Sequence, residues 1–242
     1  MLKYPANRLE DLAVLLNHVL KLGHQNDTFG VLNSAQVIVE NTGMQHWLNT
    51  QLATQNGIAM NIDYPLPGKF VWQLARQLLG DTEVPQQPPY QREALVWRID
   101  DVLASDEIRS NNEFFEANRY WQSEASGSAT TSPTANDLLK RFQLASALAD
   151  LFEQYILYRP DWLKQWQIDG QIDGQNEHQV QHWQAQLWAI LCRQDGRHPI
   201  DIQHKLMGCL SQMSGAEPNT LPQQICLFAL NTMAPATLDV FS

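Results

Sequence analysis

The chain has 242 residues, 44% hydrophobic and 9% aromatic, which is the composition of a globular protein and excludes wholesale disorder. This length suits one large domain or, as we expect, two smaller ones. Sixteen Lys and Arg residues against 26 Asp and Glu residues give a formal charge of −10, so any nucleic-acid contact has to be local rather than spread over the surface.

The sequence gives little indication of a membrane segment or of a metal site made by cysteines. No apolar run approaches the roughly 18 to 20 residues that span a bilayer, and the first residues, MLKYPANRLEDL, lack the apolar centre of a signal peptide, so we expect no membrane contact and a cytoplasmic location. Cys192, Cys209 and Cys226 are widely spaced and form no CxxC pair. They are expected to be buried free thiols.

The first elements alternate between strand and helix. Residues 2–5 (LKYP) are predicted to form a short strand, and Asn7 and Glu10 have the spacing of a helix cap. A helix ending near Gly23 follows, with apolar residues at spacings of three and four. Residues 35–39 read as a buried strand, and residues 41–43 as a turn into a second helix.

The end of the chain repeats this alternation. Residues 225–230 (ICLFAL) are predicted to be another buried strand, and residues 234–241 begin a helix that has hardly started at Ser242. We therefore expect a truncated piece of a longer protein. Strands alternating with helices predict an α/β fold with a parallel sheet.

The middle of the chain has the spacing of helices. Five are predicted, at residues 70–79, 92–104, 137–158, 179–193 and 200–213. Residues 84–89 (VPQQPP) form a Pro-rich loop, and residues 122–136 are small and polar and are expected to be mobile. We predict an α/β domain made of residues 1–80 and 216–242, interrupted by a mostly helical insertion, residues 81–215.

The sequence lacks the residues that an ATPase needs. A phosphate-binding loop, GxxxxGK followed by Ser or Thr, should come after the first strand, yet the segment there is YPANRLED. An acidic residue should end a later apolar strand to hold Mg²⁺, but Phe228 and Ala229 stand there. No ATP hydrolysis is expected from this chain itself.

Other catalytic or metal sites have weak support. His178 and His182 are four residues apart, a spacing that holds metals on helices, but no third ligand is near them in the sequence, and a solvated polar face is the simpler interpretation. Neither a GxSxG nor an HExxH motif is present. We predict no catalytic residue, no metal and no cofactor.

Three blocks of sequence resemble one family. The first, residues 37–74, contains TGM, WL, GIA, NIDYPLP and FVW in order; the second, residues 140–166, contains DLF, QY and YRPDW; the third, residues 182–188, reads HWQAQLW. Together with NRL at residues 7–9, they resemble the start of the RecC family, the gamma subunits of bacterial exodeoxyribonuclease V (RecBCD), and the likeness extends over most of the chain.

This resemblance implies a fold and a role. The fold is a degenerate superfamily 1 helicase-like parallel-sheet domain without a working nucleotide site. The role is that of a non-catalytic subunit in DNA repair and recombination, which holds RecB-like and RecD-like motor subunits, helps to split forked DNA, and scans the single strand for the Chi signal.

The resemblance also implies DNA-binding residues. They match the family's scanning surface at Glu40, Thr42, His46, Leu66 and Trp72. The family carries glutamine at the positions of Glu40 and His46, and an ionised glutamate only accepts hydrogen bonds. Either the DNA signal differs here, or these two side chains do not touch DNA.

Each motif also has a structural interpretation. Thr42 can cap a helix and Gly43 gives the turn conformational freedom. Trp72 can belong to the core. Pro160 can end a helix, with Arg159 paired to Asp161. Arg141 can contact a phosphate or form a salt bridge. At the level of the whole chain, the alternative function is a helical protein-interaction scaffold without direct DNA contact.

Overall fold

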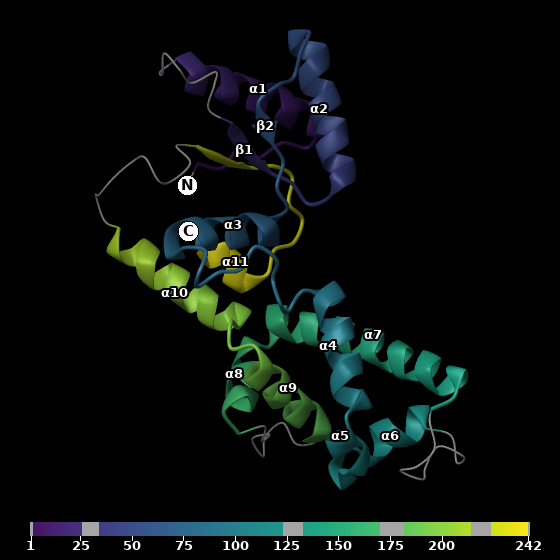
Figure 1. Ribbon diagram of the computed structural model, residues 1–242. Coiled ribbons are helices and arrows are strands. Elements are labelled where there is room, and N and C mark those ends of the chain that lie inside the picture. Colours follow the sequence, from purple (N-terminus) through teal and green to yellow (C-terminus); the bar gives the residue numbers. More distant parts are fainter. Residues whose placement is uncertain (1, 26–33, 123–132, 170–181, 214–223, 242) are drawn as a thin grey trace. The chain divides into compact units, whose positions relative to one another are not determined.

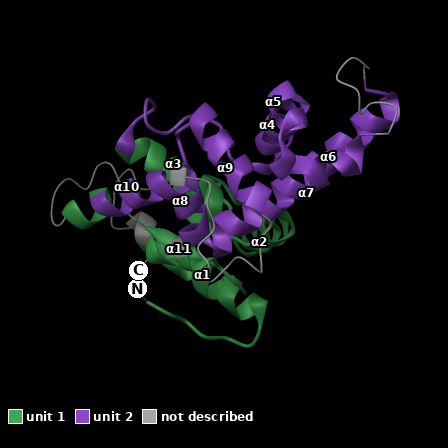
Figure 2. Ribbon diagram, turned by 90° about the horizontal axis from the view of Figure 1, so that it is seen from below, with its two compact units in different colours: residues 1–78, 209–242 green, residues 79–208 purple. Residues whose placement is uncertain are grey.

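The computed structural model describes residues 2–25, 34–122, 133–169, 182–213 and 224–241 (Figure 1). The chain divides into two compact units, which Figure 2 distinguishes by colour: unit 1 is residues 1–78 with 209–242, and unit 2 is residues 79–208. We describe each unit by itself. That these units are separate functional domains stays a prediction.

Unit 1 contains a small parallel sheet. Its strands are β1 (Ala35–Ile38), β2 (Ile62–Asp63) and β3 (Ile225–Leu227), in the order β2-β1-β3. Ala35 pairs with Ile62, and Val37 pairs with Cys226. The predicted parallel sheet is therefore confirmed, and β3 lies beside β1 although most of the chain separates them. The structure is mixed α/β and mostly helical.

The helices of unit 1 are α1 (Leu9–Gln25), α2 (Thr42–Asn56), α3 (Pro67–Leu79) and α11 (Pro235–Asp239). In Figure 1, α1 and α2 lie on one side of the strands, and α3 and α11 lie on the other. Side chains alternate along a strand, so Val37 and Val39 join the core with α1 and α2 while Ile38 is excluded from that cluster. The buried residues of this cluster are Ala13, Leu16, Leu20, Val37, Val39, Leu48, Leu52 and Phe228.

The predicted strand at residues 2–5 is wrong. These residues are exposed and belong to no strand, because the described sheet consists of β1, β2 and β3 and does not include them. Asn7 is not a cap either, since α1 begins two residues later, at Leu9. The two-residue strand β2 was too short to be recognised from an alternating pattern.

Unit 2 is helical. Its elements are α4 (Arg92–Ala104), α5 (Asp106–Ser110), the 3-10 helix η2 (Asn112–Phe114), α6 (Phe115–Trp121), α7 (Ala135–Tyr158), α8 (Pro160–Asp169) and α9 (His182–Gln194); α10 (Pro199–Gln212) starts in unit 2. The long predicted helices are confirmed. The shorter helices α5, η2, α6 and α8 were not predicted. Short helices carry too few turns for a periodic pattern.

Two predictions in unit 2 need correction. Pro160 does end α7, but it also begins α8 directly, which suits the fixed φ of proline at a first helical position. Arg159 forms no ion pair with Asp161 in the described residues; its guanidinium lies 5.1 Å from the centroid of the Trp162 ring instead. A cation over an aromatic face replaces the expected salt bridge.

The predicted mobile loop at residues 122–136 lies mostly outside the described residues. Its last two residues, Ala135 and Asn136, already belong to α7. The helix starts there because the Thr134 hydroxyl accepts from the Asp137 backbone N–H, while the Asp137 carboxylate accepts from that of Thr134. This reciprocal capping box satisfies two backbone donors that a helix start otherwise leaves without partners.

The core of unit 2 is aromatic and encloses a histidine, His198. Trp188 stands edge-on to His198, with ring centroids 5.1 Å apart, and Tyr90 contacts both rings. His198 is fully buried; its Nδ1 accepts from the Ile200 backbone N–H at 3.2 Å, and its Nε2 has no hydrogen-bond partner. Burial lowers the pKa of His198 to about 4, against a smaller opposite effect of Asp201.

His198 should make the stability of unit 2 depend on pH. Because its folded pKa lies below the unfolded value, its neutral form stabilises the fold above about pH 6.5, and this contribution is lost as the pH falls towards 4. Between pH 7.5 and pH 5 the loss should be about 2 kcal/mol. His198→Asn keeps a helix-capping oxygen but does not titrate.

Urea unfolding at the two pH values measures this effect. The pH-dependent loss of stability should be smaller in His198→Asn than in the wild type by that amount. His204→Asn is the matched control, because His204 is exposed on α10, the helix that begins directly after His198. Equal pH dependence in His198→Asn and the wild type would contradict the assignment.

Candidate functional site

The carboxyl ends of the three parallel strands of unit 1 meet at one edge of the sheet. The segments that follow them are joined by hydrogen bonds: the Val39 backbone N–H donates to the Pro65 carbonyl at 3.3 Å, and the Phe228 N–H donates to the Ile38 carbonyl at 2.9 Å. The Asn231 side-chain amide donates to the Glu40 carboxylate at 3.0 Å. Ligands of α/β sheets bind outside this edge, which we call the carboxyl edge.

The turn from β1 into α2 presents polar side chains at the carboxyl edge. Asn41 is the N-cap, and its Oδ1 accepts from the Met44 backbone N–H at 2.9 Å. Thr42 is therefore not the cap, contrary to our expectation, and its exposed side chain stands in the first turn of α2. His46 is exposed one turn further along the same helix.

Gly43 lies close to the capping side chain and has no special backbone conformation. It is not among the described glycines with positive φ. A Cβ atom at this position would lie 3.1 Å from Oδ1 of Asn41, a tight contact with the capping side chain. The predicted conformational freedom of Gly43 is therefore wrong, and close approach to the cap takes its place.

Leu66 and Trp72 lie in the loop after β2 and in α3. Pro65 is buried, whereas the neighbouring Leu66 side chain is 40% exposed. Its carbonyl accepts from the Phe70 backbone N–H at 2.9 Å, which ties the loop to the start of α3. Trp72 on α3 is half-buried, so it packs within unit 1 and keeps part of its surface accessible.

Arg141 lies in unit 2, on α7, and already has a partner. Its Nε and Nη2 atoms donate to the two carboxylate oxygens of Asp100 at 2.8 and 3.0 Å, and its guanidinium lies 5.4 Å from the Trp121 ring centroid. The two charged side chains are only 13% and 18% exposed. Of the two interpretations of Arg141, the salt bridge is present.

The first strand of the chain is β1 and not residues 2–5, so a phosphate-binding loop would have to follow β1. The segment from Val39 to Gly43 reads VENTG and contains no lysine. It has the strand-to-helix position of a phosphate-binding loop without the residues that hold phosphates.

Tyr64 follows β2 and is a titratable side chain with a shifted pKa near the carboxyl edge. Burial raises the pKa of Tyr64 to about 12, so its phenol is neutral at physiological pH. Among the described residues, no group of three or more His, Cys, Asp or Glu side chains lies close enough together to hold a metal ion. His182 is exposed on α9, and His178 lies outside the described residues.

The three cysteines are free thiols, and only Cys192 is fully buried. Cys209 and Cys226 are half-buried, so the prediction of buried thiols is confirmed for one of the three. No helix in the described part of the chain has both the length and the apolarity to cross a bilayer.

Comparison with known proteins identifies the family. The model of the RecC N-terminal domain matches residues 2–242. The chain belongs to the RecC family. The RecBCD enzyme subunit RecC of Escherichia coli K12 is 30% identical over 242 residues, which cover 98% of this chain. The same subunit of Haemophilus influenzae is 27% identical over 259 residues, again covering 98% of this chain.

The chain spans about a fifth of these RecC subunits, 20% of the Escherichia coli protein and 22% of the Haemophilus influenzae protein. A RecC subunit of Buchnera aphidicola, 22% identical, shows the same coverage, with 98% of this chain and 20% of that protein aligned. The resemblance found in the sequence is thereby confirmed, and the relatives are subunits of the RecBCD enzyme.

Sequence reasoning missed two residues of the carboxyl edge. Asn41 caps α2, and Asn231 holds the Glu40 carboxylate from the segment after β3. Asn41 was recognisable as a good capping residue directly before a helical pattern. Asn231 was not, because only the pairing of β3 with β1 brings it to Glu40.

The Arg141–Asp100 pair should contribute to the stability of unit 2. Removing one partner leaves the other charge partly buried, so Arg141→Ala and Asp100→Ala should each lower the free energy of unfolding by about 1–3 kcal/mol. The double variant should lose less than the sum, and chemical unfolding of the four proteins measures this coupling. Additive losses would show that the pair is energetically irrelevant and leave Arg141 available to another partner.

Proposed function

We propose that this chain is a non-catalytic part of a RecBCD-type helicase–nuclease in DNA repair and recombination. In this proposal it helps to split forked DNA, scans the single strand for a Chi-like signal, and helps to hold RecB-like and RecD-like subunits in the bacterial cytoplasm. The observation that carries the proposal is the family match over residues 2–242. The lack of phosphate-binding residues after β1 agrees with a non-catalytic role.

We propose that unit 1 is an inactive helicase-like domain and that the DNA strand passes its carboxyl edge. Three predicted DNA-binding residues are near strand ends there: Glu40 and Thr42 after β1, and Leu66 after β2. Extruded bases offer polar edges to hydroxyl and imidazole groups, such as those of Thr42 and His46. Apolar and aromatic groups, such as Leu66 and the accessible part of Trp72, can stack on the bases.

Glu40 has a narrower role in this proposal than a glutamine would have. One of its carboxylate oxygens already accepts from Asn231, and the carboxylate offers no donor when it is ionised. It can therefore accept from a base amino group, as on cytosine or adenine, but it cannot donate to a base carbonyl. A preference for amino-bearing bases at this position is what the Glu40–Asn231 arrangement supports.

Arg141 is the least supported member of the predicted DNA-binding set. Its guanidinium would have to leave Asp100 and Trp121 before it could neutralise a phosphate. The proposed phosphate contact of Arg141 therefore requires the loss of its pair with Asp100.

A second candidate function has its own support. The net charge of −10 and the engaged Arg141 favour a protein-interaction scaffold without direct DNA contact. Crosslinking of DNA bases to the carboxyl edge in the assembled complex would count against this alternative.

The proposed site can be tested in the complete subunit, assembled with its partner subunits on forked DNA. Thr42→Val, His46→Ala, Leu66→Ala and Trp72→Ala should each reduce signal-dependent cutting, by about tenfold for Trp72→Ala, because a stacked base contributes on the order of 1–3 kcal/mol. ATP-dependent unwinding should stay within about twofold of the wild type, because the motor subunits are intact.

Matched controls come from the same unit. Thr54→Val repeats the Thr42 change three turns along α2, and Ile58→Ala removes an exposed apolar side chain that follows α2 and precedes β2. Both should leave signal-dependent cutting unchanged. Wild-type cutting in all four site variants would overturn the site assignment while leaving the family membership untouched.

A further inference from the structure

Unit 2 exposes an apolar patch on two neighbouring helices. Trp97 on α4 is 66% exposed, and its ring lies beside that of Phe142 on α7, with centroids 5.3 Å apart. Leu138, one turn before Phe142 on α7, is 43% exposed. We call these three side chains the Trp97 patch. Exposed apolar side chains are ordinary when single, but a cluster around a tryptophan is typical of an interaction site.

Carboxylates stand at both ends of the Trp97 patch. Glu93, Trp97 and Asp101 recur at four-residue spacing and so share one face of α4, with the acidic residues before and after the tryptophan. On α7, Glu153 lies about three turns beyond Phe142 on the same face. The patch is therefore an apolar centre between negative charges.

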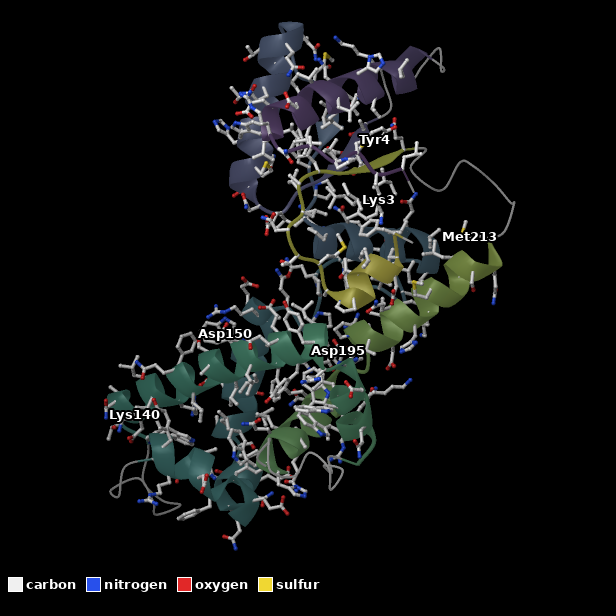
Figure 3. All side chains as sticks on the ribbon, turned by 180° about the vertical axis from the view of Figure 1, so that it is seen from behind. Lys3, Tyr4, Lys140, Asp150, Asp195 and Met213 are labelled. Atoms are coloured by element: carbon white, nitrogen blue, oxygen red, sulfur yellow. The ribbon has the colours of Figure 1, made fainter. Side chains whose placement is uncertain are left out.

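Two described cations near the patch, Arg92 and Arg141, already pair with carboxylates. Arg92 pairs with Asp150, and it is the only cation among the described residues whose charge acts on Glu153. Burial raises the pKa of Glu153 most, and the nearby charges of Glu93 and Asp150 raise it further, so three acidic side chains lie close together there. Lys140 is well separated from Asp150 along α7 (Figure 3) and projects roughly opposite to Phe142 around the helix axis.

These charges select among the occupants of the patch. A nucleic acid is disfavoured, because phosphates would approach Glu93, Asp101 and Glu153, and the nearby described cations Arg92 and Arg141 already pair with carboxylates. A second copy of this chain would bring carboxylates against carboxylates, at a net charge of −10 for each copy. A protein segment with an apolar anchor between Lys or Arg residues matches both the centre and its ends.

We propose that the Trp97 patch is a docking site for a basic amphipathic helix of a partner protein. The apolar side chains of that helix would cover Trp97, Phe142 and Leu138, and its basic side chains would meet Glu93, Asp101 and Glu153. Tryptophan is enriched among residues that dominate binding energy at such interfaces. This inference goes beyond the single-strand proposal and does not depend on it, because the two surfaces belong to different units.

The support of the patch is rigid, which favours binding. α4 and α7 pack along their lengths, and the Asp100–Arg141 pair joins the same two helices beside Trp97 and Phe142. Because the aromatic rings already contact each other, little side-chain freedom is left to lose when a partner binds.

A photocrosslinker at position 97 tests the identity of the occupant. Trp97→p-benzoylphenylalanine is introduced into the complete subunit, the complex is assembled on forked DNA and irradiated, and crosslinked peptides are mapped by mass spectrometry. The proposal expects a crosslink to another polypeptide, in a segment with Lys or Arg on both sides of apolar residues. A crosslink to DNA, to the same polypeptide or to a second copy would overturn it, and so would the absence of any crosslink.

A model peptide tests the chemistry of the patch in the 242-residue chain. The probe is a fluorescein-labelled 14-residue amphipathic peptide of Leu and Lys, and its acidic counterpart of Leu and Glu serves for comparison; binding is followed by anisotropy. Trp97→Ala should weaken binding of the basic peptide by about tenfold, Phe142→Ala and Glu153→Gln should weaken it less, and the acidic peptide should not bind.

Phe115→Ala is the matched control, because Phe115 is 61% exposed on α6 and lies outside the patch. The affinity of the Phe115→Ala variant for the basic peptide should be within about twofold of the wild-type affinity. Failure of the basic peptide to bind, equal binding of the acidic peptide, or wild-type binding by Trp97→Ala would each overturn the proposal. Circular dichroism of each variant confirms that the exposed substitutions leave the helices intact.

Discussion

The pairing of β3 with β1 is the interaction on which unit 1 depends. β2 is only two residues long, so without β3 the central strand would keep an open edge whose backbone donors and acceptors lack partners. The same pairing delivers Phe228 to the core with α1 and α2, and Asn231 to Glu40. One short ladder between residues far apart in sequence therefore builds both the core and the carboxyl edge.

The local part of this fold was predictable from the sequence, and the non-local part was not. The spacing of apolar residues predicted both ends of α4 and the last residue of α7, and it placed the start of α7 two residues late. A long amphipathic helix repeats its apolar spacing over several turns, so it can be recognised from the sequence. The supposed strand at residues 2–5 failed, because a strand exists only if a partner is available and a tetrapeptide does not say whether one is. β2 and Asn231 depend on the same kind of distant partner, and so they were missed.

In the candidate site, too, some residues could be named from the sequence, whereas the contacts of others became visible only in the structure. Thr42, His46 and Leu66 were named from resemblance, and exposure at their positions agrees with a role in binding. The roles of Asn41 and Gly43 in the turn needed coordinates, since the choice between Asn41 and Thr42 as the cap depends on one hydrogen bond. Arg141 illustrates the opposite case: a basic residue in a matching block has a neighbour, Asp100, that only helix packing reveals.

The discontinuity of unit 1 also has a consequence for synthesis. Unit 2 is one continuous stretch, residues 79–208, and it is translated completely before β3 leaves the ribosome. At typical elongation rates the nearly 190 residues between β1 and β3 take about 10 to 40 s. During that interval β1 has a vacant edge, so nascent unit 1 is the part of this chain that most needs a chaperone or another temporary cover.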